Sequence, residues 1–399
     1  MTTILVSTGR RHVPFSEPSG YLHSIDIEEQ TILRTSLPIE PAYREFDDNP
    51  RGGLRGCRGI AIGDDEIAIA NSSIIFRYDS HWNLLGAITH PSCAGIHDIL
   101  YQDDSIWVTA TRSDLLIQFD LSGQLIKHYY LRDPSPALQA LKWRAPILLK
   151  AKDIEGGQLD LRNPKTHDRE AHNRVHINGV CMLPDGEIIA SMGLIMSGFH
   201  TNLIRAKVFL SHIGLWDYFI TINKQIQRVL RRGKNMHSNL VVQPVKGQSA
   251  VVRIDPQRNH TLVFASKDMT VPSHSLMTMP DGTIIYLNTT EGKVIHFNLT
   301  THEIISSTKV TDGFLRGATH LGNGFLALGS KQEILLFDLE ARRIQTKMIF
   351  TADINEAVYD IKMLPEHYLL PPDSLEAHFR STTGFNAQDI VQEGRLYRP

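Results

Sequence analysis

The sequence has few cysteines and none of the spacings that make cysteine structural. Only three occur in 399 residues, at Cys57, Cys93 and Cys181, far apart and without a C-x-x-C pair. Isolated cysteines in odd number do not form a disulfide framework, and they favour a reducing compartment. A chain of this length can bury enough apolar surface to fold without disulfides or a structural metal. We therefore expect a cytoplasmic protein with unpaired cysteines.

Long hydrophobic runs and an excess charge of one sign are also missing. No run of about 18 uncharged apolar residues occurs, so we expect no conventional transmembrane helix. Residues 1–21 contain Arg10 and Arg11 but no apolar run after them, so we expect no signal peptide. The 41 Lys and Arg residues nearly balance the 43 Asp and Glu residues, for a net charge of −2. That balance excludes a broadly basic nucleic-acid-binding protein and an acidic disordered one.

Several motifs of well-known chemistry are absent as well. The sequence has no Walker A motif, no G-x-G-x-x-G after a predicted strand, no H-E-x-x-H and no G-x-S-x-G. Each of these motifs positions a phosphate, a metal or a nucleophile by its backbone geometry and spacing. We therefore expect no nucleotide cofactor and, without a basic stripe of interleaved aromatic residues, no nucleic-acid partner.

The chain does contain a repeated pattern of short apolar runs separated by tight-turn residues. Turn pairs such as Asp-Gly at 185–186, Asp-Gly at 281–282 and Asn-Gly at 323–324 precede runs that are typical of strands. Gly, Asn and Asp are favoured there because they tolerate the positive φ of hairpin turns. In several copies a third strand ends in Phe-Asp, as at 119–120 and 337–338.

The copies keep a fixed spacing. In five of them a polar residue stands seven positions before the turn, as His274 stands before Asp281, and a sixth, weaker copy starts near Glu356. Repeated strand–turn–strand units of this kind are typical of propellers. We predict an all-β fold, a six-bladed β-propeller formed by residues 1–399 as one domain. Strands within 4–36 are expected to complete the last blade, which would leave no open sheet edge.

Two insertions interrupt the repeat. Residues 131–174 are rich in Pro and charged residues, and residues 196–242 have helical periodicity. We predict that both form a helical cap over one end of the propeller. The broad apolar surface of 203–234 has a basic edge, which leaves a peripheral membrane contact or a dimer contact as alternatives. The polar tail, 371–399, is expected to contain one short helix and to wrap the outside.

Alignment of the copies places six polar side chains in one register. The innermost strand of each propeller blade runs along the central channel, so the starts of these strands converge at one mouth. The six residues are Arg58, His97, Asn178, His274, Arg316 and Tyr359. Desolvated polar groups are costly unless they are paired, so this ring predicts a binding site. His176, two residues before Asn178, is expected on the same strand face and directed into the mouth.

Three histidines of this set are predicted to bind one divalent metal ion. His97, His176 and His274 come from different blades, and three protein ligands leave a position open for water or substrate. Imidazole suits Zn, Fe or Ni, and Ca is a further candidate. Asp98 is expected to be a fourth ligand or a hydrogen-bond acceptor behind a ligand. In a site without metal, His97 and His274 would act as general base and acid.

The remaining ring residues predict the kind of substrate. Arg58 and Arg316 would clamp a carboxylate or phosphate, because the guanidinium fork matches oxyanion geometry. Asn178 is predicted to bind substrate, and Tyr359 to donate a proton or to stabilise an oxyanion. We expect an enzyme that acts on a small anionic metabolite or a peptide-like substrate by lyase, isomerase or cyclase chemistry. The alternative is a non-catalytic propeller that binds a ligand or a protein partner.

Short motifs around the ring resemble those of a bacterial family of propeller-like proteins that has no settled activity. They are His-x-Asn-Gly at 176–179, Pro-Ser-His-Ser at 272–275 and Gly-Phe-x-Arg-Gly at 313–317. The inserted Ser273 departs from the tighter Pro-His-Ser pattern. The resemblance, over roughly 54–337 without the two insertions, implies that the ring is important without naming a reaction.

A looser similarity concerns residue types alone. Metal-dependent lyase propellers such as the peptidyl-α-hydroxyglycine amidating lyases use three channel histidines with a metal, beside Arg and Tyr. Streptogramin lyases and strictosidine synthase-like propellers also work at the channel mouth. These similarities imply chemistry at the mouth, although a shared fold does not fix a function.

Overall fold

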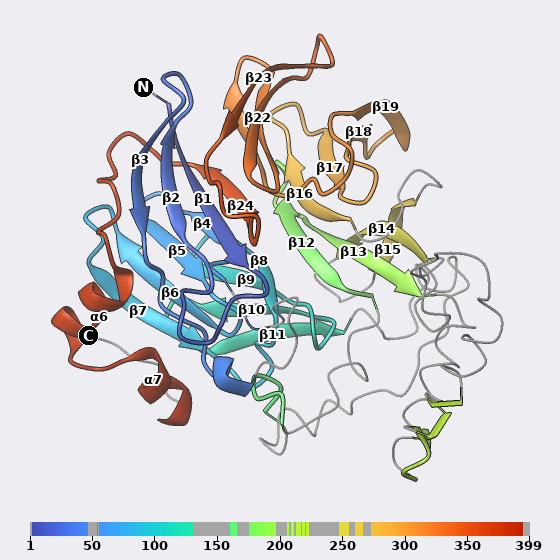
Figure 1. Cartoon of the computed structure of the whole chain (residues 1–399). Coiled ribbons are helices and arrows are strands. Elements are labelled where there is room, and N and C mark those ends of the chain that lie inside the picture. Colours follow the sequence, from blue (N-terminus) through green and yellow to red (C-terminus); the bar gives the residue numbers. More distant parts are fainter. Residues whose placement is uncertain are drawn as a thin grey trace.

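The strands form six four-stranded sheets around a central channel (Figure 1). The computed structural model describes residues 2–46, 54, 56–130, 160–165, 175–196, 247–254, 260–265 and 273–393, with scattered positions between 206 and 222. Neighbouring strands within each described sheet pair antiparallel. The predicted six-bladed β-propeller is therefore confirmed.

In five blades the strands follow one another in chain order from the channel outward. The first blade contains β4 (Ile60–Ile62), β5 (Glu66–Ala70), β6 (Ile74–Asp79) and β7 (Leu84–Thr89). The second contains β8 (Ile96–Gln102), β9 (Ser105–Ala110), β10 (Leu115–Asp120) and β11 (Leu125–Tyr130). The third contains β12 (Ile177–Met182), β13 (Ile188–Met196), β14 (Gly247–Ile254) and β15 (His260–Ala265). The fourth contains β16 (His274–Thr278), β17 (Ile284–Asn288), β18 (Lys293–Asn298) and β19 (Glu303–Lys309). The fifth contains β20 (Ala318–Gly322), β21 (Phe325–Ser330), β22 (Glu333–Asp338) and β23 (Arg343–Ile349).

The sixth blade combines strands from the two ends of the sequence. Its innermost strand is β24 (Glu356–Met363), followed outward by β1 (Thr3–Arg10), β2 (Leu22–Asp26) and β3 (Thr31–Ser36). The antiparallel register of β1 against β24 runs from Ile4 opposite Met363 to Arg10 opposite Glu356. The first and last segments are thus joined by a ladder of backbone hydrogen bonds, which holds the ring closed.

The hydrophobic core lies between the blades. Six clusters of buried side chains are found, and each combines residues of two neighbouring sheets. The middle strand β9 is buried along its whole length because both of its faces are covered. The outer strand β23 alternates between exposed and half-buried residues, as expected at the rim of a blade. Cys57, Cys93 and Cys181 are buried and unpaired.

The C-terminal tail contains two helices, where the sequence predicted one. α6 (Leu375–Thr383) begins at Ser374, whose hydroxyl accepts a hydrogen bond from the Ala377 N–H, and it ends at Gly384 with φ of +74°. α7 (Ala387–Glu393) follows at once. At the start of α7, Asn386 and Asp389 each accept a hydrogen bond from the other's backbone N–H, which caps the helix.

The predicted cap falls mostly outside the described residues. Within 131–174, the described turn at 160–165 packs Leu161 into the core between the first and second blades. Within 196–242, described positions such as Phe209 and Tyr218 are exposed. The cap and the membrane or dimer contact of 203–234 stay predictions, as does the cytoplasmic location. In the described part of the chain, no helix has both the length and the hydropathy needed to cross a membrane.

Candidate functional site

The six ring residues lie together at one end of the channel. Four of them lie within the inner strands β8, β12, β16 and β24, and Arg58 and Arg316 stand two residues before β4 and β20. A pocket opens at this end, and its lining includes His97, Asn178, His274, Arg316 and Tyr359. Arg58 lies against the same tyrosine, with Cζ 5.1 Å from the ring centre.

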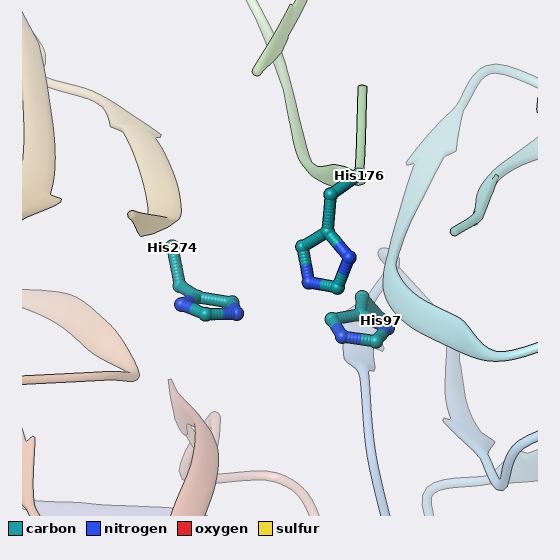
Figure 2. A group of neighbouring side chains, drawn as sticks. All are labelled: His97, His176 and His274. Atoms are coloured by element: carbon teal, nitrogen blue, oxygen red, sulfur yellow. The ribbon is translucent and has the colours of Figure 1, made fainter. Parts of the chain in front are cut away.

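Three imidazoles converge at this mouth (Figure 2). The ring centres of His97 and His176 are 5.0 Å apart. The ring centre of His274 lies 5.9 Å from that of His97 and 5.8 Å from that of His176. One nitrogen from each ring lies within 4.8 Å of the nitrogens of the other two. Three consecutive blades therefore direct ring nitrogens at a common point.

His176 reaches this point from a loop, so its predicted place on a strand face is wrong. It precedes β12 and has a left-handed backbone, with φ of +53°. The carboxylate of Asp114, from the second blade, accepts hydrogen bonds from the amides of Val175 (3.1 Å) and His176 (3.0 Å). This contact with a neighbouring blade imposes the turn, and strand alternation could not predict it.

Hydrogen bonds orient two of the three imidazoles. Nδ1 of His97 lies 2.8 Å from the carbonyl oxygen of Gly95, so this nitrogen carries the proton and Nε2 holds a lone pair. Nδ1 of His274 lies 2.9 Å from the hydroxyl of Thr289. Such partners behind a ring are typical of histidines that bind metals, because they fix the ring angle and, where the partner is a carbonyl, the tautomer.

The environment keeps all three imidazoles neutral. Burial and the positive charge of Arg316 lower the pKa of His97 and of His274 well below the usual value. The same causes lower the pKa of His176 to about 3. A metal ion binds the neutral form of imidazole, so the protonation state suits a metal ligand.

The donor set fits a transition metal better than calcium. Bonds of about 2.1 Å to a tetrahedral ion place ligand nitrogens about 3.4 Å apart. Separations of at most 4.8 Å are within reach of this arrangement by small side-chain shifts. Zn and Fe accept imidazole nitrogen, whereas Ca takes six to eight oxygen ligands. We therefore retain Zn and Fe as the candidates.

Arg316 is a buried cation beside this group. Its Cζ lies 3.2 Å from the ring centre of Tyr359, and its exposed fraction is 6%. Within the described residues, no carboxylate forms an ion pair with it. Burial lowers the pKa of Arg316, Tyr359 raises it in part, and the charges of Arg58 and Arg11 lower it further, so the net shift is downward. A desolvated cation without a counterion is costly, so this side chain is suited to bind an anion.

Asn178 and Asp98 line the pocket, but their polar atoms already have partners. The side-chain amide of Asn178 donates to the carbonyl oxygen of Ser273, and its Oδ1 accepts from the Ser191 hydroxyl at 2.9 Å. The two oxygens of Asp98 accept from the amides of Ile99 and Val180, each at 3.0 Å. These contacts hold neighbouring blades together, and they favour positioning over the predicted substrate binding or metal ligation.

The prediction missed one charged residue of the pocket, Lys362. Its Nζ lies 3.5 Å from Oδ1 of Asp360, and both residues line the pocket below the ring. The carboxylate of Asp360 also accepts from the amide of Ile60 at 2.9 Å, which links the sixth blade to the first. Lys362 stands two residues after Asp360, so strand alternation could have identified it once the sixth copy was placed.

Comparisons with known proteins establish the fold and no family. No protein-family model matches the sequence, and no curated protein matches it. The resemblance to the uncharacterised bacterial family therefore stays a prediction.

Among solved structures, the chain is similar to a protein of unknown function from Bacteroides caccae, with 10% identity and a TM-score of 0.50. That match covers 92% of this chain and 99% of the other. A chain of a nidogen/laminin complex matches with 8% identity and a TM-score of 0.50, over 91% and 97% of the two chains. Virginiamycin B lyase from Staphylococcus aureus matches with 11% identity and a TM-score of 0.44, over 76% and 72%. At identities this low, the two matches with a TM-score of 0.50 show a shared fold only.

Proposed function

We propose that the protein is a metal-dependent enzyme that acts at the channel mouth on a small substrate carrying an anionic group. The observation that carries this proposal is the convergence of His97, His176 and His274, whose ring nitrogens lie within 4.8 Å of one another. The same pocket contains Arg316, a buried cation suited to an anion. Structural residues rarely gather three neutral imidazoles and a buried guanidinium at one opening.

The chain's own groups have distinct roles in this proposal. The carbonyl of Gly95 holds the His97 ring with a lone pair on Nε2, and the hydroxyl of Thr289 fixes the angle of the His274 ring. A bound Zn or Fe ion would polarise a substrate oxygen as a Lewis acid. Arg316 and Arg58 would bind the anionic group, because two guanidiniums near one another match its charge and geometry.

Tyr359 is the candidate proton donor. Its ring centre lies 3.2 Å from Cζ of Arg316, 5.1 Å from Cζ of Arg58 and 5.4 Å from the ring centre of His97. Two guanidiniums against the ring hold the phenol at the pocket, where its hydroxyl can reach a bound substrate. Tyr359 would thus give a proton to the substrate and take one back from it.

Lyase, isomerase and cyclase reactions need the set of groups found here. They move protons and stabilise charge, and they require no transferred hydride or phosphoryl group. The sequence carries no nucleotide-binding motif of the kinds considered above. We therefore propose this group of reactions, with a peptide-like or metabolite substrate.

Metal analysis tests the proposal directly. The protein is produced in medium with added Zn and Fe, and bound metals are quantified by mass spectrometry. We expect about one equivalent of a transition metal, and its loss in the double variant His97→Ala, His274→Ala. The matched control is His81→Ala, His302→Ala, which removes two exposed histidines from outer hairpin turns. Metal-free protein that also gives no Co²⁺ absorption bands on titration would contradict the metal site.

A further inference from the structure

Arg11 lies at the same end of the channel, and the roles assigned above do not include it. It directly follows β1, whose last residue Arg10 pairs with Glu356 at the start of β24. Tyr359 stands near the start of the same inner strand, so β1 ends at the mouth. The backbone N–H of Arg11 donates to the carbonyl oxygen of Asn355 at 2.8 Å, which fixes this residue beside the sixth blade.

A ring contact of Arg11 and the ion pairs of the preceding residue hold Arg11 at the rim. Its Cζ lies 5.2 Å from the ring centre of Phe314, two residues before Arg316. Phe314 has a left-handed backbone with φ of +51°, a conformation that costs a bulky residue about 1–2 kcal/mol. The preceding Arg10 forms ion pairs with Asp353 (2.7 Å) and Glu17 (3.0 Å), which immobilise the loop. Strain of this kind persists where the surrounding structure requires one placement.

The charge of Arg11 acts on the pocket. It contributes to the lowered pKa of both Arg316 and His274, so the Arg11 guanidinium lies within electrostatic reach of them. Arg58 acts in the same way on Arg316 and His97. The groups that act most strongly on Arg316 and on the three histidines include no carboxylate. Arg11 and Arg58 thus act on the same pocket residues as Arg316 does, at a pocket whose lining also includes Asp98, Asp360 and Lys362.

We propose that Arg11 and Arg316 together bind a dianionic group of the substrate, such as a phosphoryl group. The inference rests on the proposed function and narrows its substrate class. A single carboxylate would satisfy one guanidinium fork, whereas a phosphoryl group has three oxygens and about two charges to share between two forks. Binding such a group would also relieve the repulsion between the two arginines.

Calorimetric titration with two simple anions tests the proposal. Sulfate keeps two charges at neutral pH and acetate has one, and both are titrated into the purified protein at constant ionic strength. We expect the wild type to bind sulfate at least about tenfold more tightly than acetate. Arg11→Gln should weaken sulfate about tenfold and change acetate less than about twofold. Arg316→Gln should weaken both anions.

The controls distinguish a failure of the role of Arg11 from a failure of the proposed function. Arg342→Gln, in the turn between β22 and β23 at the other end of the fifth blade, should leave both affinities unchanged. Arg11→Met keeps the aliphatic contact with Phe314 and should behave as Arg11→Gln does, and melting curves without anion verify that both variants fold. Full sulfate affinity in both Arg11 variants would overturn the role of Arg11 and leave the proposed function standing. Absence of any Arg316-dependent anion binding in the wild type would overturn both.

Discussion

Alternate blades contribute two kinds of side chain to the ring. The first, third and fifth blades supply Arg58, Asn178 and Arg316, and the others supply His97, His274 and Tyr359. Each side chain of the first kind contacts the next blade. Arg58 donates to the carbonyl of Ile96, directly before His97, and Asn178 donates to that of Ser273, directly before His274. Arg316 stacks on Tyr359. The side chains of the first kind thus hold those of the second in place, while Asn178 and Arg316 also line the pocket themselves.

This arrangement predicts a double effect for Asn178→Ala. The substitution removes the contacts with Ser273 and Ser191 and leaves buried polar atoms unpaired, so we expect a loss of about 1–3 kcal/mol in the free energy of unfolding. Because Ser273 precedes His274, Co²⁺ affinity should also fall about tenfold. Urea unfolding and Co²⁺ titration measure the two effects. Asn83→Ala, at an exposed turn, is the control, and unchanged Co²⁺ affinity in Asn178→Ala would refute the positioning role.

We expect Arg316→Met to stabilise the protein, in contrast to Asn178→Ala. The guanidinium is buried without a carboxylate partner in the described residues, and an apolar side chain of similar length removes that desolvation cost. Stacking on Tyr359 offsets part of the gain, so we expect the variant to be about 1 kcal/mol more stable while it loses sulfate binding. Urea unfolding together with calorimetry gives both values. A variant that is less stable than the wild type would show that Arg316 serves structure instead of ligand binding.

At the scale of elements, features encoded by adjacent residues could be predicted from the sequence, whereas features imposed by contacts between blades could not. Tight turns such as that at Gly282, with φ of +80°, are encoded by adjacent residues, so strands and their spacing could be inferred directly. The ring followed from this spacing, because equivalent positions of a propeller converge. The backbone turn at His176 could not be inferred, since a carboxylate from another blade imposes it. For the same reason, the bonds that engage Asp98 and Asn178 were visible only in the folded chain.

The closing blade contains a buried polar network that crosses all four of its strands. His23 on β2 lies between the Thr35 hydroxyl on β3, at 2.9 Å, and Oε1 of Glu356 on β24, at 2.8 Å. The hydroxyl of Thr8 on β1 donates to the same carboxylate oxygen at 2.6 Å. Burial would raise the pKa of Glu356, but the hydrogen bonds from His23 and Thr8 and the charge of His23 outweigh it, so the pKa is lowered.

This network makes the stability of the ring depend on pH. A carboxyl group with a lowered pKa stabilises the fold above the pKa of the unfolded chain, about 4.5, and the contribution is lost as the pH falls through the folded value. We expect Glu356→Gln to cost about 1–3 kcal/mol at pH 7, and the difference from the wild type to shrink below pH of about 4.5. Urea unfolding at several pH values measures this difference. Glu376→Gln, a surface pair with Arg380, should show neither effect, and a constant difference for Glu356→Gln would contradict the linkage.

At the scale of the whole molecule, the C-terminal tail packs against the first and sixth blades. The indole N–H of Trp82 donates to the carbonyl of Leu369 at 2.7 Å, and Leu37 forms a bridge with Ser374. Phe379 of α6 is fully buried and meets the ring of Phe76 edge-on, with centres 5.8 Å apart. The tail helices pack into the cluster that joins the first and sixth blades, where the chain closes the ring.

Phe379→Ala therefore tests whether the packing that closes the ring can be weakened without a loss of metal binding at the histidines. The variant leaves a cavity in a fully buried cluster, so we expect a loss of about 3–5 kcal/mol in the free energy of unfolding. Phe385→Ala removes a side chain that is 44% exposed in the same tail, and it should cost less than about 1 kcal/mol. Since the tail packs on the outer part of the blades and the histidines converge on the channel, metal content per folded molecule should remain unchanged in both variants. Denaturant unfolding and metal analysis of the folded fraction measure the two quantities. Metal lost in Phe379→Ala but not in Phe385→Ala would mean that the packing of the tail also sets the geometry of the mouth, through the inner strands β24 and β4.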